Sequence, residues 1–359
     1  MTHPLDVDDL RARVGKALAA FLDGQAPSLD AVGPELTPAL SAAQDFLLEG
    51  GKRLRPAFAY WGWRGAGGSD CDEVVAAASS LELLHACALI HDDLMDGSDT
   101  RRGNPSVHRR FAAMHRGERW HGAPESFGLS AAVLLGDMCL VWADAMLWGS
   151  GLDPAALVRA QPVYDAMRIE LMAGQYLDVL EQAVGSSSVE RSLRVARYKS
   201  AKYTIERPLH LGATLAGAGP ATVQAYTDYG VGLGEAFQLR DDVLGVFGDP
   251  SETGKPAGDD LREGKRTVLV AEALTQATPA QSAAVSRLLG DPRLDAAGVS
   301  TLREVIVDTG ALDATERRIT ASLDAALGAL DAAAADGCID GEAAGVLREL
   351  AVAATARSV

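Results

Sequence analysis

The stretch DEVVAAASSLELLHACALIHDDLMD, residues 72–96, decides the fold class. Its first part, residues 72–94, is rich in alanine and leucine and contains neither proline nor glycine. Alanine and leucine favour helix, and alanine fits a strand poorly, so this segment predicts one long apolar helix. The helix ends in an acidic run, Asp92-Asp93-Leu94-Met95-Asp96.

Helical periodicity continues on both sides of this segment. Residues 97–125 are rich in Gly, Arg, Pro and His and predict a long loop with a short helix inside it. No segment alternates convincingly as a strand, no internal repeat is present, and no Pro/Ser-rich linker divides the chain. The sequence therefore predicts an all-α protein. The remaining helices are expected at 7–23 (ending before Pro27), 37–48, 127–149, 155–183, 189–206, 208–217, 221–247, 267–276 and 279–290, with three more in 297–356.

Composition excludes several classes of protein. Apolar residues make up 48% of the 359 residues and charged residues 23%, which is typical of a globular protein and excludes disorder. The net charge of −16 argues against binding nucleic acid or an anionic membrane surface through the overall field. The four cysteines, at 71, 87, 139 and 338, lack metal-ligand spacing and predict free thiols of a reducing compartment. Because no uncharged apolar run approaches 18 residues, we expect a cytoplasmic protein without a transmembrane segment.

The acidic run at the end of the 72–94 helix has a chemical interpretation. Asp92 and Asp96 are four residues apart and therefore share one helix face. Carboxylates at a helix C-terminus oppose the helix dipole and repel each other, unless cations compensate. Mg²⁺ takes one or two carboxylates together with phosphate oxygens and water, so the pair is a candidate Mg²⁺ site.

A second acidic pair, Asp241-Asp242, follows another apolar helix and precedes another glycine-rich loop. Lysine and arginine residues lie near both pairs and in the upstream segment 50–56. Such cations, together with the backbone amides of glycine turns, are the groups that bind diphosphate. The pattern predicts a site for Mg²⁺ and one or two diphosphates.

Four motifs resemble those of the trans-isoprenyl diphosphate synthase (polyprenyl synthetase) family. They are GGKRLRP (50–56), LLHACALIHDDLMDGSDTRRGNPSVH (83–108), YKSAKYT (198–204) and FQLRDDVLGVFGDPSETGKPAGDDLREGKRT (237–267). The resemblance implies a single-domain bundle of about a dozen helices around a deep central cavity, normally in a homodimer. The domain would span 1–359, with the motifs in about 45–270 and residues 279–359 completing the bundle.

The family transfers prenyl groups: it condenses isopentenyl diphosphate head-to-tail with an allylic diphosphate. The resemblance implies three Mg²⁺ ions per active site, bound by Asp92, Asp96, Asp241 and Asp242. It implies that the catalytic residues are Asp92, Asp96, Asp241, Lys199 and Lys255.

The same resemblance assigns the substrate-binding residues. Isopentenyl diphosphate would be bound by Lys52, Arg55, His85 and Arg102. The allylic diphosphate would be bound by Arg101, Lys199, Ser200, Gln238, Lys255 and Lys265. Lys199-Ser200 fits the Lys-Thr pair of the family best, and Lys202 is the alternative because the segment after it is shifted by one residue.

Gly245 departs from the family pattern, because a full second DDxxD motif would place its last aspartate there. Since the first aspartate of that motif carries the ligand role in the family, we do not expect the glycine to inactivate the protein, and an aspartate at this position is expected to change activity little.

Product length would depend on the helix positions that precede Asp92 by successive turns, namely Cys87, Ala88, Leu84 and Leu81. In the family, bulky aromatic residues just before the first motif stop the product at fifteen carbons. Cys87 and Ala88 are small, which favours geranylgeranyl diphosphate over a farnesyl or a longer polyprenyl product.

Two further hypotheses come from other classes. A class I terpene cyclase also uses an aspartate-rich helix end and Mg²⁺, but it needs an aromatic-rich cavity, and aromatic residues are only 5% of this chain. A non-catalytic subunit of a heteromeric synthase would be expected to have lost carboxylates, whereas the first motif is intact here.

Overall fold

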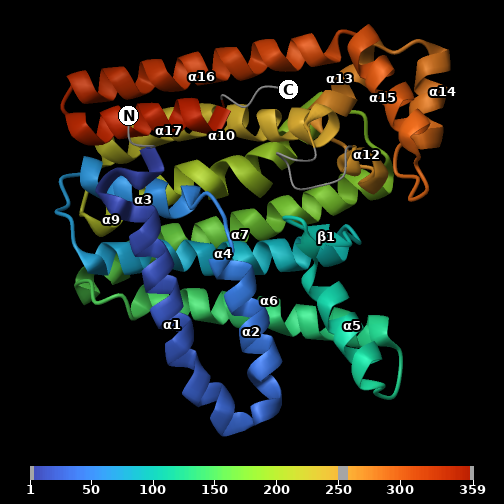
Figure 1. Ribbon diagram of the computed structural model, residues 1–359. Helices are drawn as coiled ribbons and strands as arrows, with labels where there is room; N and C mark the ends of the chain where they lie inside the picture. Colours follow the sequence, from blue (N-terminus) through green and yellow to red (C-terminus); the bar gives the residue numbers. More distant parts are fainter. Residues whose placement is uncertain (1–3, 250–257, 356–359) are drawn as a thin grey trace.

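The computed structural model describes residues 4–249 and 258–355, and nearly all of them are helical (Figure 1). The strands in these residues are two-residue segments, β1 (Thr100–Arg101) and β2 (Asn104–Pro105), which pair antiparallel within the loop that was expected to lack strands. Because all the other elements of the described residues are helices, the structure confirms the all-α fold class.

The helices in the first half of the chain are η1 (Pro4–Asp9), α1 (Leu10–Val32), η2 (Pro34–Leu36), α2 (Thr37–Leu48), α3 (Leu54–Gly65), α4 (Asp72–Met95), α5 (Val107–Glu118), α6 (Pro124–Trp148) and α7 (Pro154–Val184). Those in the second half are α8 (Val189–Val195), the π-helix η3 (Ala196–Glu206), α9 (Arg207–Leu215), α10 (Pro220–Phe247), α12 (Asp259–Glu263), α13 (Val268–Gln276), α14 (Pro279–Leu288), α15 (Ala296–Asp308), α16 (Ala311–Ala335) and α17 (Gly341–Thr355).

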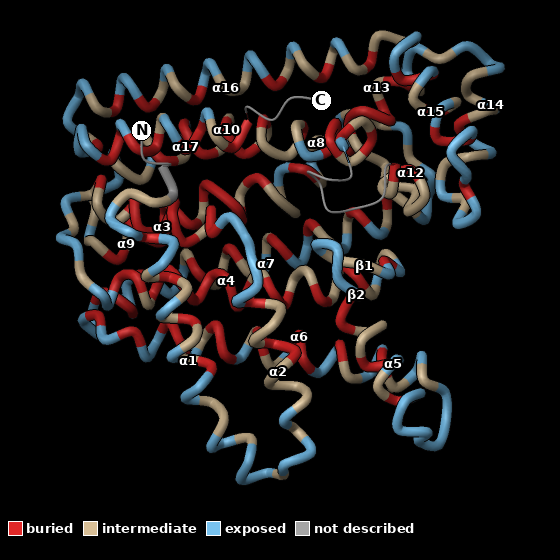
Figure 2. Tube along the Cα trace, viewed as in Figure 1, coloured by how far each residue is buried: buried red, intermediate tan, exposed pale blue. Residues whose placement is uncertain are grey.

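Helix α4 runs through the interior and packs against α1, α3 and α6, whereas α10 packs against η3 and α16. Figure 1 shows α16 along the upper edge of the molecule, and the ends of α1 and α2 project at the bottom of the molecule. Buried residues concentrate in the inner helices, as Figure 2 shows, and the outer sides of α14 and α16 are exposed. The arrangement places the acidic ends of α4 and α10 in the interior.

Several helices differ from the sequence-based expectation. Helix α1 continues through Pro27 to Val32, because Pro27 lies in an exposed stretch where water can replace the backbone hydrogen bond that proline removes. The predicted helix 189–206 is divided into α8 and the π-helix η3. Helix α3 was not expected, since its sequence contains proline, glycine and many aromatic residues.

Two glycines explain how α3 packs. A Cβ atom on Gly62 would lie 2.5 Å from the Leu209 carbonyl oxygen, and one on Gly212 would lie 1.9 Å from the Ala59 carbonyl oxygen. The glycines therefore allow α3 and α9 to approach more closely than side chains would permit. This contact fixes the segment that follows the GGKR turn.

The described residues include two helices, α4 and α6, that are long and apolar enough to cross a membrane by length and composition alone, although neither contains an uncharged run of 18 residues. In α4, 72% of the apolar window is buried inside the protein, as in the core helix of a globular protein. In α6 the buried share is 39%, so part of its apolar surface is exposed.

Candidate active site

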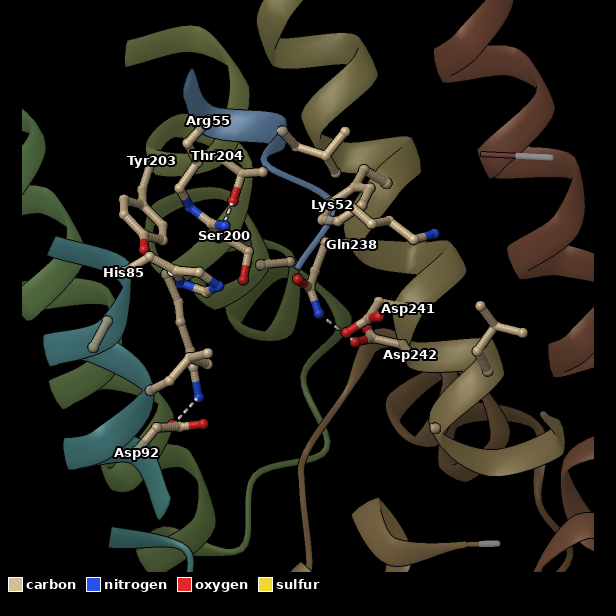
Figure 3. Close-up of a pocket in the computed structure, with 18 of the residues that line it drawn as sticks. Lys52, Arg55, His85, Asp92, Ser200, Tyr203, Thr204, Gln238, Asp241 and Asp242 are labelled. Atoms are coloured by element: carbon tan, nitrogen blue, oxygen red, sulfur yellow. Dashed lines mark hydrogen bonds and ion pairs between the residues drawn. The ribbon is translucent and has the colours of Figure 1, made fainter. Parts of the chain in front are cut away.

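A cavity of about 960 Å³ lies between the helices that carry the sequence motifs. Its walls come from α3, α4, α7, α8, η3, α10, α12 and α17, together with the segments around Gly51, Arg101 and Lys265. Figure 3 shows Asp92 and the Asp241–Asp242 pair on helices on opposite sides of this space. The aspartate pairs, far apart in sequence, thus face a common cavity.

Asp92 stands at the cavity end of α4 and is surrounded by donors. It accepts hydrogen bonds from Gln175 Nε2 (2.9 Å) and Lys199 Nζ (3.0 Å), and Arg101 Nη2 lies 3.7 Å away. Burial would raise the pKa of Asp92, but the charges of Lys199, Lys265 and Arg101 outweigh it and lower the pKa below its ordinary value. Asp92 is therefore ionised and ready to bind a cation.

Asp96, one turn further, is more deeply buried and does not itself line the cavity. Its Oδ2 atom lies 3.3 Å from Lys265 Nζ and accepts no hydrogen bond. Burial, aided by the charge of Asp92, raises the pKa of Asp96 to about 6. Between the two, buried Asp93 accepts a hydrogen bond from Arg101 Nε (2.9 Å) and so directs that guanidinium toward the site.

On the opposite wall, Asp241 and Asp242 have different environments. Asp241 is exposed in the cavity, whereas Asp242 is buried and accepts a hydrogen bond from Gln238 Nε2 (2.7 Å). Burial raises the pKa of Asp242 well above its ordinary value, and the charges of Asp260 and Asp241 add to this. Asp241 is the better placed of the two to bind a cation.

Lys265 lies between the end of α4 and helix α12. Its ammonium group lies 2.7 Å from Glu263 Oε2, 3.3 Å from Asp96 Oδ2 and 3.4 Å from Asp260 Oδ1. Burial would lower the pKa of Lys265, but the surrounding carboxylates raise it well above the ordinary value. Lys265 therefore remains charged in the middle of the acidic cluster.

The π-helix η3 carries the YKSAKYT motif and separates its two lysines. Lys199 lines the cavity, where its Nζ is 3.0 Å from Asp92 Oδ1 and 2.6 Å from Asp178 Oδ2. Lys202 is not among the cavity residues and instead forms ion pairs with Glu206 (2.9 Å) and Glu170 (3.5 Å). Of the two candidates from sequence, the structure brings Lys199 to the carboxylates.

Glycines on the neighbouring helices make room for the wide π-helix. A Cβ atom on Gly174 of α7 would lie 2.3 Å from the Lys199 nitrogen, and Cβ atoms on Gly230 and Gly234 of α10 would approach the η3 backbone within 2.8 Å. π-helical turns change the side-chain spacing of a helix and often occur at functional sites. The packing of η3 against these glycines therefore determines which of its side chains reach the cavity.

The other end of the cavity is basic and aromatic. Arg55 donates to Thr204 Oγ1 (2.8 Å), and its guanidinium lies 4.2 Å from the centre of the Tyr203 ring. A hydrogen bond of 2.8 Å joins the Tyr203 hydroxyl to His85 Nδ1. Burial and the charge of Arg55 lower the pKa of His85 well below its ordinary value, so its ring is neutral. Lys52 lies at this end on the segment before α3 (Figure 3).

The GGKR turn that presents Lys52 and Arg55 is built around Arg53. Gly50 and Gly51 have φ values of 90° and 98°, and Arg53 has a φ of 55°, all in the left-handed region. Arg53 is buried and forms an ion pair with Glu82 on α4 (2.6 Å). This pair holds the turn against α4, so Arg53 has a structural role that the sequence did not reveal.

Most of the site residues expected from sequence lie around this one cavity. Lys52, Arg55, His85, Arg101, Arg102, Lys199, Ser200, Gln238 and Lys265 all line it. Lys255 lies outside the described residues. Of the positions expected to set product length, Ala88 lines the cavity, whereas Cys87, Leu84 and Leu81 are buried in the helix packing.

Sequence reasoning did not single out Gln175 and Asp178, although both line the cavity. They occur in the segment GQYLD, residues 174–178, and contact Asp92 and Lys199 respectively. Helix α7 carries several other charged residues, among them Arg168 and Glu170, so the sequence alone gave no signal that set this pair apart.

Within residues 4–249 and 258–355, no three His, Cys, Asp or Glu side chains are arranged to hold a metal ion by themselves. The cavity instead offers separate carboxylates on two walls and cations between them. This donor set fits Mg²⁺ bound together with diphosphate, because Mg²⁺ takes few protein ligands and keeps phosphate oxygens and water.

The family model for polyprenyl synthetase matches residues 37–306. The chain belongs to the polyprenyl synthetase family. It is accordingly a trans-prenyltransferase, and the chemistry of the family is Mg²⁺-dependent.

Relatives and solved structures agree with this assignment. The chain is 35% identical over 286 residues to a geranylfarnesyl diphosphate synthase of Aeropyrum pernix, covering 78% of this chain and 83% of that protein. It is 32% identical over 280 residues to a geranylgeranyl diphosphate synthase of Mycobacterium tuberculosis, covering 78% and 75%. The crystal structure of a geranylgeranyl pyrophosphate synthase from Corynebacterium glutamicum, complexed with isoprenyl diphosphate and magnesium, has a TM-score of 0.94 at 44% identity, covering 98% of this chain and 100% of that one.

Proposed function

We propose that this prenyltransferase condenses isopentenyl diphosphate with an allylic diphosphate and releases geranylgeranyl diphosphate. The observation that carries the proposal is the pair of aspartate-bearing helix ends, α4 and α10, on opposite sides of one cavity with cations between them. An allylic diphosphate held there would lie with its phosphates among Lys199, Lys265 and Arg101.

These cations favour breakage of the allylic C–O bond, because their fixed charges stabilise the negative charge that develops on the leaving diphosphate. When bound at Asp92, Asp96, Asp241 and Asp242, Mg²⁺ would add further charge stabilisation, and we propose three ions per site. Lys52, Arg55, Arg102 and neutral His85 would hold isopentenyl diphosphate so that its alkene faces the allylic cation. The alkene then attacks the allylic cation and forms the new C–C bond, and the released diphosphate accepts the proton that the resulting cation loses. The alkene is the nucleophile, so no protein nucleophile is required.

Product length is proposed from the walls below Asp92. The small side chain of Ala88, one turn before Asp92, lines the cavity, as do Leu89 and Leu171. Relatives named for twenty-carbon and twenty-five-carbon products are consistent with a chain longer than fifteen carbons. Between these we propose geranylgeranyl diphosphate as the product.

The test is to incubate the purified protein with isopentenyl diphosphate, Mg²⁺ and each of dimethylallyl, geranyl and farnesyl diphosphate, and to identify the products by mass spectrometry. Accumulation of the twenty-carbon product from all three primers is the expected result. A fifteen-carbon end product, or a cyclised hydrocarbon, would contradict the proposal.

We further propose a cytoplasmic homodimer formed through α6 and α7. Large apolar side chains are exposed on both helices, among them Leu134 (63%) and Val141 (65%) on α6, and Ile169 (68%) and Tyr176 (69%) on α7. The two residues named on each helix are seven apart and therefore share one face of that helix. Ile169→Glu is expected to convert a dimer into a monomer in light-scattering chromatography; a wild-type monomer would contradict the proposal.

A further inference from the structure

The ring of His91 joins α4, the helix that ends in the first aspartate pair, to α6. His91 directly precedes Asp92 in the chain, and its Nε2 atom lies 3.1 Å from the Val133 carbonyl oxygen of α6. The Asp137 carboxylate is 3.8 Å from the same nitrogen. Because a carbonyl oxygen can only accept a hydrogen bond, Nε2 carries the proton and donates it. A side-chain hydrogen bond thus ties the end of α4 to the backbone of α6.

The other ring nitrogen holds the ring in this orientation. Nδ1 lies 3.8 Å from Sγ of Cys87, which is one turn earlier on the same helix. Burial, aided by the charge of Asp137, raises the pKa of Cys87 to about 12. The thiol therefore keeps its proton and donates a weak hydrogen bond to Nδ1. The ring of His91 is held at both nitrogens.

Helix α6 has a glycine at the point where the ring meets its backbone. A Cβ atom on Gly136 would lie 2.5 Å from His91 Cδ2 and 2.9 Å from Cε1, and closer still to Nε2. A methyl group there would push the ring away from the Val133 carbonyl, since a histidine side chain can rotate. The buried residues of α6 are apolar or glycine, and apolar burial is non-directional. The hydrogen bond therefore specifies the position of α4 on α6 more sharply than the surrounding packing does.

The end of α4 requires such a restraint. Asp92, Asp93 and Asp96 place three carboxylates there, where they oppose the helix dipole and repel one another. Asp92 must nevertheless stay within hydrogen-bond distance of Lys199 (3.0 Å) and Gln175 (2.9 Å). A displacement of about 1 Å at a reacting site can cost about 100-fold in rate, so the anchoring of this helix end matters for catalysis.

We propose that His91 is a positioning residue that holds Asp92 at the metal site by tying the end of α4 to α6. The inference rests on the proposed role of Asp92 as a Mg²⁺ ligand. Among the described residues, those that line the cavity do not include His91. Its effect on the reaction is therefore exerted through Asp92, not through contact with the substrate.

The experiment breaks the hydrogen bond from both of its sides. His91→Met removes the donor and keeps an unbranched side chain of similar reach, whereas His91→Gln keeps an N–H donor. In His91→Met the Mg²⁺ concentration for half-maximal rate should rise about tenfold and kcat should fall about tenfold, with KM for isopentenyl diphosphate within about threefold. His91→Gln should stay within about threefold of the wild type in all three quantities.

Gly136→Ala leaves His91 unchanged but displaces its ring, so it should raise the Mg²⁺ requirement as His91→Met does. Alanine also favours helix over glycine, so a general loss of stability would not explain this effect. Because both changes break the same bond, the double variant should be within about threefold of the worse single variant.

A second readout does not depend on turnover. Mg²⁺ and inorganic diphosphate added together should raise the Tm of the wild type and of His91→Gln more than the Tm of His91→Met or Gly136→Ala. If the wild type forms no prenyl product, the proposed function fails, whereas this thermal shift still tests the position of Asp92.

Two control variants make the same chemical changes elsewhere. His121→Met alters an exposed histidine between α5 and α6, and Gly328→Ala alters an exposed glycine of α16 where a Cβ would meet nothing within 4 Å. Both should behave as the wild type. A wild-type Mg²⁺ dependence in either His91→Met or Gly136→Ala would overturn the proposal, as would a double variant whose loss equals the product of the single losses.

Discussion

The lysines of the π-helix allow a sharp test, because one faces the carboxylates and the other faces away. Lys199→Gln removes an ammonium group that lies 3.0 Å from Asp92 and 2.6 Å from Asp178 and is 19% exposed. Lys202→Gln removes the same group three residues later, at 13% exposure, from a pair of glutamates outside the cavity. The two variants are therefore matched in chemistry and in burial.

The magnitude follows from the charge that is removed. A charge-assisted hydrogen bond is worth about 1.5–3 kcal/mol, and each 1.4 kcal/mol is a factor of ten, so the loss of one donor to a diphosphate costs about 10- to 100-fold. The loss should lie at the upper end of this range, because without Lys199 the pKa of Asp92 rises and its charge is less favoured. We expect kcat/KM for the allylic substrate to fall about 100-fold in Lys199→Gln.

Lys202→Gln should keep kcat/KM within about threefold of the wild type while lowering the Tm, because it leaves the buried Glu206 without its nearest cation. Steady-state kinetics with the allylic diphosphate varied, together with calorimetry of both variants, measure these effects. Equal losses of kcat/KM, or a larger loss in Lys202→Gln, would refute the assignment of Lys199 to the diphosphate.

Four more outcomes are expected. Asp96→Ala and Asp241→Ala should each lower turnover about 100-fold at saturating substrate, because each removes charge stabilisation from one wall; wild-type rates in both would contradict the metal assignment. Arg55→Ala should raise KM for isopentenyl diphosphate more than KM for the allylic substrate, and equal effects would argue against separate phosphate sites. Ala88→Phe should shift the products toward fifteen carbons in a mass-spectrometric assay, and an unchanged spectrum would remove this residue from the channel wall. Burial and the charge of Arg207 lower the pKa of His210 to about 4. In the unfolded chain His210 therefore binds a proton near pH 6.5, whereas in the folded protein it binds one only near pH 4. About 3 kcal/mol of the free energy of unfolding is therefore lost as the pH falls from 6.5 to 4. His210→Gln should show a smaller fall in Tm over this range, and an identical fall would refute the linkage.

The helix class and the ligand-bearing helix ends could be predicted because both depend on local patterns. The run from Asp72 to Asp96 combines helix propensity, apolar periodicity and an acidic end within one continuous segment. The helix that follows the GGKR turn was not predicted, because its stability depends on the close contact of Gly62 with α9, which lies about 150 residues away in the chain.

The site shows the same division between local and non-local information. An α-helical spacing cannot decide between Lys199 and Lys202, since the choice depends on a π-helix that is accommodated by glycines of α7 and α10. Likewise, Gly245 looks like the loss of a carboxylate in the sequence. That Asp260 of α12 lies beside this position becomes visible only when α12 is packed against α10.

The central claim is that this cavity transfers a prenyl group through metal-assisted loss of diphosphate. The most direct measurement is the incorporation of radiolabelled isopentenyl diphosphate into an allylic primer by the wild type and by Asp92→Asn, each over a titration of Mg²⁺. The account predicts product formation that requires Mg²⁺ in the wild type and a rate about 100-fold lower in the variant. No incorporation by the wild type with any primer, or an undiminished rate in Asp92→Asn, would contradict it.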